Sequence, residues 1–329
     1  MKLPRRQFLH LATSAAALPA FSRIARAQTY PWRPITVVVP FVAGGALDVF
    51  GRVLAERMRA SLGQTIIIEN VAGATGSLGV GRVARAAPDG HTIVIGYWGT
   101  HVANGALYAL PYDVLRDFEP IALTVAIPML IVSTNAAPAN NLRELIGWLK
   151  ANPDKASAGT AGVGDISHVG GVLFQNITGT RFNLVPYRGA APATQDLIAG
   201  HIDLMLLNLT NSLPYIRDGS IKAFAVMANT RSAATPEIPT VDQAGLPGFY
   251  VTLWLGLWAP KGTPKDVTAK LNSTVVSALA DPTVRTRLSE LGMEIFPRDQ
   301  QTPEALAGYQ KAEIEKWWPI IKAAGIKLE

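Results

Sequence analysis

The sequence predicts an α/β protein built of two doubly wound lobes, and three observations support this class. The chain of 329 residues is 49% hydrophobic and only 16% charged, which is typical of a folded globular protein and not of a disordered one. Its length is enough for two domains of ordinary size, each with its own core. Apolar β-branched runs also alternate with segments of helical periodicity, as in parallel sheets covered by helices on both faces.

Each strand is predicted where an apolar run lacks the alternation of a half-exposed strand. Ile35–Pro40 is the first such run, and a Gly-containing turn leads from it into a helical period with Val49 and Val53 on one side. Pro128 breaks a later run, and Pro282 stands at a first helical position. The expected strands are 35–40, 65–69, 91–96, 121–134, 183–187, 203–207, 221–228 and 250–259, and the expected helices include 77–87, 142–151, 264–280, 282–291 and 303–323.

Residues 1–27 have the features of an export signal. A basic start leads into the apolar stretch Phe8–Ala20, and Ala25–Ala27 offers a small-x-small cleavage site after Ala27. The tract Pro4–Leu9 resembles a twin-arginine signal, although Pro4 and His10 depart from the usual pattern. The alternative is a general secretory signal with a chance pair of arginines. Both routes predict export to the periplasm.

The charge of the chain excludes several classes of function. The full chain has a net charge of +6, but residues 1–27 hold five basic residues and no acidic one. The remaining 302 residues carry 25 basic and 24 acidic residues, a net charge of +1 that offers no electrostatic footprint for nucleic acid. The absence of cysteine excludes disulfides, thiol nucleophiles and Cys-ligated metal sites. No cofactor or metal is expected.

Three strand-to-helix turns carry the residues suited to binding. In α/β sheets, ligands lie beyond the carboxyl ends of the strands, on loops that lead into helices. The turn 40–48 contains Gly44 and Gly45, which bring backbone N–H groups and a helix N-terminus close to an anion. The turns 97–101 and 159–168 end in hydroxyl and imidazole groups, and Asn208 adds an amide at a further strand end. Each hydroxyl alone is as well explained by helix capping.

Motifs of catalysis are missing from the same turns. The chain has no Gly-x-Ser-x-Gly elbow and no His-Glu-x-x-His motif. The Gly79–Ala84 string lies inside a predicted helix, where it indicates close packing and not dinucleotide binding. Asp165, Ser167 and His168 are too close along one turn to reach the geometry of a catalytic triad.

Short motifs in a fixed order give the chain a family resemblance. They include Tyr30-Pro31-Trp32-Arg33-Pro34-Ile35, Ala86-Ala87-Pro88-Asp89-Gly90-His91-Thr92, Val185-Pro186-Tyr187-Arg188-Gly189 and Ile238-Pro239-Thr240-Val241. With the Gly44-Gly45 turn, they resemble the Bug-type receptors, which are the extracytoplasmic solute-binding proteins of tripartite tricarboxylate transporters. The resemblance covers essentially the whole mature chain.

The resemblance implies a periplasmic-binding-protein fold of the Venus flytrap type, with the ligand between two lobes. The chain would cross twice, so that lobe 1 takes 28–128 and 248–329 and lobe 2 takes 129–247. The turns and the resemblance together give these candidate ligand-binding residues: Phe41, Ala43, Gly44, Gly45, Asp48, Trp98, Thr100, Thr160, Asp165, Ser167, His168 and Asn208.

Four candidate residues depart from the family pattern or keep two interpretations. Trp98 stands where a small residue is usual, and it either lines the cleft or packs in the core. Asp165 replaces a usual Ser or Thr: facing the cleft it would repel a second carboxylate, whereas as a helix cap it says nothing of the ligand. Ala43 stands where Pro is common, and Asp48 either caps a helix or contacts the ligand.

The sequence therefore predicts a monomeric periplasmic receptor that captures a small organic carboxylate and delivers it to the membrane permease subunits of a tripartite tricarboxylate-type transporter. It is not expected to be an enzyme. One alternative is an exported α/β hydrolase that acts on a carboxylated substrate. The other is a ligand sensor for a membrane signalling partner.

Overall fold

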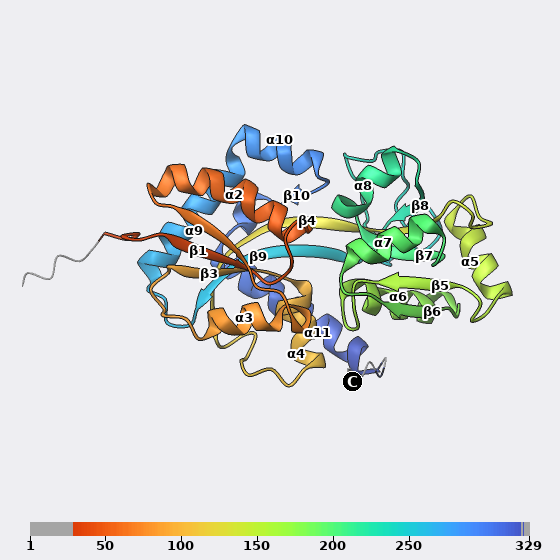
Figure 1. Ribbon diagram of the computed structural model, residues 1–329, viewed down its shortest axis with the longest axis horizontal. Helices are drawn as coiled ribbons and strands as arrows, with labels where there is room; N and C mark the ends of the chain where they lie inside the picture. The colour runs from red at the N-terminus through yellow and green to blue at the C-terminus, as the bar shows by residue number, and fades with distance from the viewer. Residues whose placement is uncertain (1–28, 324, 326–329) are drawn as a thin grey trace, which may run out of the picture.

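The computed structural model describes residues 29–323 and 325, so the predicted export signal lies outside the described residues. Within them, the strands hydrogen-bond in the order β2-β1-β3-β9-β4-β7-β5-β6, and β8 and β10 also pair with β4. Helices lie on both sides of the strands, and the long strands β4 and β9 run through the middle of the molecule (Figure 1). The predicted α/β class is confirmed.

The strands and helices follow the predicted order. The strands are β1 (Ile35–Val39), β2 (Ile66–Asn70), β3 (Thr92–Tyr97), β4 (Phe118–Thr134), β5 (Ser157–Thr160), β6 (Asn183–Pro186), β7 (Leu204–Asn208), β8 (Ile221–Val226), β9 (Thr252–Pro260) and β10 (Glu294–Ile295). The longer helices are α2 (Ala46–Leu62), α3 (Ser77–Ala84), α5 (Leu142–Ala151), α6 (Ile166–Thr178), α7 (Ala190–Ala199), α8 (Leu209–Arg217), α9 (Lys265–Ala280), α10 (Pro282–Glu290) and α11 (Pro303–Ala323). The short helices are η1 (Ala74–Gly76), η2 (Gly99–Ala103), α4 (Asn104–Leu107) and η3 (Arg298–Gln300).

The sheet has two halves that share β4. In the first half, β1 pairs in parallel with β2 and β3. In the second half, β5 pairs in parallel with β6 and β7. The apolar runs favoured parallel strands, but the sheet is mixed: β9 is antiparallel to both β3 and β4, and β4 is antiparallel to β7 and β8. The long strands β4 and β9 lie at the centre of the sheet and run opposite to the parallel strands beside them.

Strand β4 corrects the prediction that Pro128 breaks the apolar run 121–134. The strand is continuous over 17 residues, and Pro128 lies where its partner changes. Pro128 pairs with Thr252 of β9 in the first half, and the next residue, Met129, pairs with Asn208 of β7 in the second half. Since proline has no N–H to donate, a change of partner is a position where a strand tolerates it.

His101, in η2, is buried in the core of the first half. Its ring stacks on Trp258 with 3.8 Å between centroids and 14° between planes, and burial lowers its pKa to about 3. Below pH 6.5 the unfolded chain takes up a proton at this histidine that the folded protein does not. Burial also lowers the pKa of His91 and of His168. All three histidines therefore make the folded protein less stable as the pH falls.

We therefore expect the free energy of unfolding to fall as the pH falls from 6.5 toward 3, by about 2 kcal/mol from His101 alone between pH 8 and pH 5. Urea denaturation followed by circular dichroism at each pH measures it. The variant His201→Gln is the control, because it removes an exposed histidine and leaves the buried His101 in place. An unfolding free energy that is constant from pH 8 to pH 5 would contradict a buried neutral His101.

Candidate ligand-binding site

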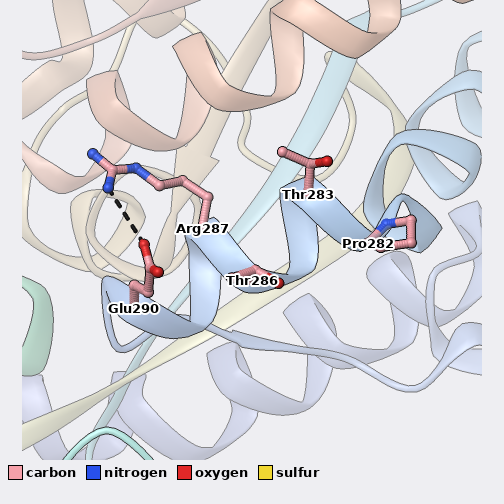
Figure 2. Close-up of a pocket in the computed structure, with 5 residues that line it drawn as sticks. All are labelled: Pro282, Thr283, Thr286, Arg287 and Glu290. Atoms are coloured by element: carbon pink, nitrogen blue, oxygen red, sulfur yellow. Dashed lines mark hydrogen bonds and ion pairs between the residues drawn. The ribbon is translucent and has the colours of Figure 1, made fainter.

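Two surface depressions in the described part of the chain lie away from the predicted turns. The larger, of about 470 Å³, runs along α10 and is lined by Pro282, Thr283, Thr286, Arg287 and Glu290 (Figure 2). The second, of about 390 Å³, lies between α9, α10 and the segment 295–301. Neither is lined by any of the twelve predicted residues. The candidate site is therefore built from the turns themselves.

The turn between β1 and α2 presents an open helix N-terminus. Gly44 adopts φ +88°, a conformation that favours glycine, and Gly45 is the N-cap residue of α2. No side chain among the described residues caps this helix, so the N–H groups of its first turn keep their hydrogen-bonding capacity. A 17-residue helix also places the positive end of its dipole here. The arrangement suits one anionic group.

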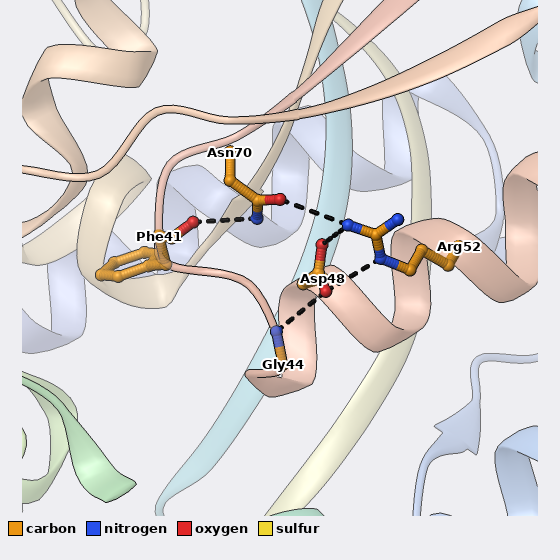
Figure 3. Close-up of polar contacts among 5 residues, drawn as sticks. All are labelled: Phe41, Gly44, Asp48, Arg52 and Asn70. Atoms are coloured by element: carbon orange, nitrogen blue, oxygen red, sulfur yellow. Dashed lines mark hydrogen bonds and ion pairs between the residues drawn. The ribbon is translucent and has the colours of Figure 1, made fainter. Parts of the chain in front are cut away.

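Asp48 braces this turn from within. Its Oδ2 accepts hydrogen bonds from the Gly44 N–H at 2.9 Å and from Arg52 Nε at 3.0 Å (Figure 3). Burial raises the pKa of Asp48, but the bonds from Arg52 and Gly44 outweigh burial and hold the pKa below its usual value. The side chain is buried, and its negative charge is matched by Arg52. Asp48 thus holds the turn in shape, and a ligand carboxylate approaching Gly44 and Gly45 meets no unpaired charge from it.

Asn70, at the end of β2, supports the same turn and was missed by the sequence analysis as a site residue. Its Nδ2 donates to the Phe41 carbonyl at 3.0 Å, and its Oδ1 accepts from Arg52 Nη2 at 3.4 Å (Figure 3). These bonds tie the start of the turn to the Asp48–Arg52 pair. The signal in the sequence was that Asn70 directly follows the predicted strand 65–69.

The turn after β3 points two predicted residues inward. Trp98 is fully buried and packs edge-on against Trp317, with 5.2 Å between the centroids and 81° between the planes. Thr100 is also buried, and its hydroxyl group bonds to the backbone of Tyr97 and to His101. In this structure Trp98 lies in the core, as in the second of its two interpretations. The methyl group of Thr100 and the Phe41 ring both lie against Gly76.

The turn after β5 is organised by Asp165, the N-cap residue of α6. Its Oδ1 accepts from the Ser167 N–H at 2.9 Å and from Ser167 Oγ at 2.7 Å. Ser167 Oγ in turn accepts from the Ala161 N–H at 2.9 Å. The capping role considered for Asp165 is therefore present. Because Ser167 donates to Asp165 and not to a histidine, this turn contains no activated serine nucleophile.

His168 is a neutral group in this turn. Its Nδ1 accepts from the Gly164 N–H at 3.3 Å, which leaves the ring proton on Nε2. Burial lowers the pKa of His168 and outweighs the opposite effect of Asp165. A neutral Nε2–H is a hydrogen-bond donor that does not itself carry charge.

Asn208 ends β7 on the strand next to β5. Its Oδ1 caps α8 by accepting from the Asn211 N–H at 3.0 Å. Within the described residues its Nδ2 has no hydrogen-bond partner, so the amide keeps two donors. Thr160 ends β5 with its hydroxyl 3.4 Å from the Gly162 carbonyl. Both predicted residues are thus at the carboxyl ends of neighbouring parallel strands, as expected.

Tyr97 joins the turns of the two halves and is the main residue that the sequence analysis missed. Its hydroxyl donates to Asp165 Oδ2 at 3.2 Å, across 68 positions of the chain. Its ring also meets Phe41 edge-on, with 5.3 Å between centroids. The turns after β1, β3 and β5 are therefore in contact. Nothing in the sequence singled out Tyr97 over Trp98, because both follow the same apolar strand.

Further contacts connect the halves on either side of the Tyr97–Asp165 bond. Leu107 of α4 lies directly against Gly164 of the β5–α6 turn. Leu209, at the start of α8, packs on Gly292, where a Cβ would lie 2.6 Å from its Cγ. Of the predicted residues, the structure brings together Phe41, Thr100, Asp165 and Ser167 around Tyr97, whereas Trp98 turns away from them and Ala43 is exposed at the tip of its turn.

The described residues form neither a metal-binding cluster nor a membrane-spanning helix. Between residues 29 and 323, no three His, Asp or Glu side chains converge in a way that would hold a metal ion. Over the same residues, no helix combines the length and the apolar character needed to cross a membrane. The groups that the turns offer are backbone N–H, hydroxyl, amide and neutral imidazole.

Comparison with known proteins gives this arrangement a family. Residues 50–326 match the model of the tripartite tricarboxylate transporter family receptor, TctC. The chain belongs to this receptor family. The family resemblance stated from the sequence is therefore confirmed. The periplasmic-binding-protein type of fold is confirmed too, because the structures of the periplasmic binding protein BugD and of MatC match this chain over their whole length.

Three TctC-type relatives show how close the match is. BugT of Bordetella pertussis is 32% identical over 323 residues, which cover 98% of this chain and 97% of BugT. The periplasmic binding protein BugD is 41% identical, with a TM-score of 0.84 over 91% of this chain and all of BugD. MatC of Rhodopseudomonas palustris, solved with bound malate, is 40% identical, with a TM-score of 0.83 over 89% of this chain and all of MatC.

Proposed function

We propose that this TctC-family protein is a periplasmic receptor that captures a small organic carboxylate between two lobes and delivers it to membrane permease subunits. The lobes are 28–128 with 248–329 and 129–247. The protein acts as a monomer and catalyses no reaction. Export removes residues 1–27 after Ala27. The observation that carries the proposal is the uncapped N-terminus of α2 behind Gly44 and Gly45, in contact through Phe41 and Tyr97 with the turn after β5.

The chemistry of the turns supports reversible binding of a carboxylate. Backbone N–H groups at a helix N-terminus stabilise an anion through hydrogen bonds and the helix dipole, without a neutralising cation. Asp48 holds the turn in place through the Gly44 N–H, and its charge is neutralised by Arg52, so neither charge is available to the ligand. A site of neutral donors releases its ligand readily, and a dissociation constant near the micromolar range, about −8 kcal/mol, fits a receptor that must unload.

A thermal-shift screen tests this function. The mature protein, residues 28–329, is first unfolded and refolded to remove any ligand that it carries from expression. It is then heated with linear dicarboxylates, amino acids, and aromatic mono- and diacids. A hundredfold excess over the dissociation constant stabilises the folded state by about 2.7 kcal/mol, so we expect the midpoint to rise by roughly 5 °C with a selective subset.

The screen separates the proposal from the hydrolase alternative. Each stabilising compound is recovered and analysed by mass spectrometry. Recovery of the unchanged compound supports a receptor, whereas its conversion would establish the hydrolase alternative. If refolded protein of native circular dichroism is stabilised by no carboxylate, the proposed ligand class is wrong.

A further inference from the structure

The helix N-termini of the turns after β1 and β5, which are linked through Phe41 and Tyr97, differ in charge. The N-terminus of α2 has no side-chain cap and is preceded by Gly45. The N-terminus of α6 is already occupied by the carboxylate of Asp165, which accepts the Ser167 N–H. A ligand carboxylate can therefore bind at the N-terminus of α2, whereas the N-terminus of α6 already binds the carboxylate of Asp165.

Asp165 differs from Asp48 in having no cation beside it. Asp48 is paired with Arg52 at 3.0 Å. Among the ion pairs of the described residues, none includes Asp165. Arg188, in the neighbouring turn after β6, is exposed and forms no ion pair with it within that part of the chain. The three hydrogen bonds to Asp165 come from neutral donors, so its negative charge is not cancelled.

Tyr97 holds this carboxylate at the boundary between the halves. The ring of Tyr97 is buried and lies directly against Gly99, where a side chain would collide with it. Burial, and then the charge of Asp165, raise the pKa of Tyr97 well above its ordinary value, so its hydroxyl remains a donor. The bond of 3.2 Å turns Asp165 Oδ2 toward the first half. That is the side on which the Gly44-Gly45 turn lies.

We propose that Asp165 excludes a second carboxylate from the site, so that the ligand carries one carboxylate together with a neutral or cationic donor such as an amide or an ammonium group. The proposal rests on the proposed function, because it assumes that the first carboxylate binds at Gly44 and Gly45. Two carboxylates close together repel each other, which disfavours a second ionised carboxylate beside Asp165. A donor group at the same place instead hydrogen-bonds to Oδ2, which retains a lone pair besides the one that Tyr97 occupies.

The test compares each diacid with its own monoamide, which has nearly the same shape. Isothermal titration calorimetry measures succinate against succinamate and adipate against adipamate, and the ω-amino acids 3-aminopropanoate and 5-aminopentanoate provide the cationic donors. For the chain length that fits, we expect the purified protein to bind the monoamide or the amino acid at least tenfold more tightly than the diacid.

Two variants assign this preference to the charge of Asp165. Asp165→Asn and Asp165→Ser keep a residue that caps helices well, so the α6 turn should fold. In both variants we expect the preference over the diacid to shrink to less than threefold. Asp218→Asn is the matched control, since it removes an exposed carboxylate at the opposite end of α8 from Asn208. It should leave the preference unchanged.

The outcomes distinguish this inference from the proposed function. Equal or tighter binding of the diacid by the unmodified protein overturns the role of Asp165 while leaving carboxylate binding intact. A preference that persists in Asp165→Asn also overturns it. If no member of the panel binds at all, then the carboxylate site itself is wrong, and the inference about Asp165 is wrong with it.

Discussion

Replacing Gly45 by valine should abolish ligand binding and leave the fold intact. Gly45 has φ −77° and ψ 169°, which valine adopts readily, and the nearest atom to an added Cβ is the Val42 carbonyl oxygen at 3.9 Å. The new side chain would cover the open N–H groups at the start of α2, which a carboxylate must approach closely. We expect at least a hundredfold loss of affinity, about 2.7 kcal/mol, in calorimetric titration.

The fold of the Gly45→Val variant can be checked independently of the ligand. Its circular dichroism and its unfolding midpoint without ligand should match those of the unmodified protein within about 2 °C, because no atom is displaced. Gly147→Val is the control, because Gly147 lies on α5, with no atom within 4 Å of an added Cβ and far along the chain from the turns. It should leave the affinity unchanged. A folded Gly45→Val protein with unchanged affinity would rule out the proposed carboxylate site.

Replacing Gly96 by alanine should cause the largest loss of stability. Gly96 lies in β3 opposite Gly256 of β9. A Cβ at Gly96 would overlap the His101 ring and lie 2.8 Å from Trp258, so the stacked pair of rings must move. Overpacking a core in this way costs about 3 kcal/mol, which lowers the unfolding midpoint by roughly 5 °C. Scanning calorimetry measures the change.

A double-mutant cycle tests the cause of this loss. His101→Ala removes the ring that the new methyl group would strike, so adding Gly96→Ala to it should cost much less than Gly96→Ala alone. Gly147→Ala, in an open position on α5, is the control and should be neutral or slightly stabilising, as alanine favours helices. Additive effects of the two core substitutions would show that Gly96 is not required by the His101–Trp258 stack.

Much of the fold was predictable from local patterns. The helix 142–151 and the helix 303–323 were predicted with the boundaries that the structure shows, and the apolar runs placed the first strands within one or two residues. These elements depend on periodicity, capping residues and prolines close by in the sequence. The direction of β9 and the continuity of β4 through Pro128 were not predictable in this way, because both depend on strands that are distant in the chain.

The candidate site was likewise predictable only in part. By itself, the sequence determined the order of strands and helices, the glycine turn before α2 and the family to which the chain belongs, since each is a property of neighbouring residues or of motifs in order. Only the tertiary structure decided that Trp98 lies in the core, that Asp48 is matched by Arg52, and that Asp165 is held by Tyr97. The sequence gives the charge and the hydrogen-bonding capacity of each side chain. Whether a protein partner already occupies them depends on which distant residues the packing brings within about 3 Å.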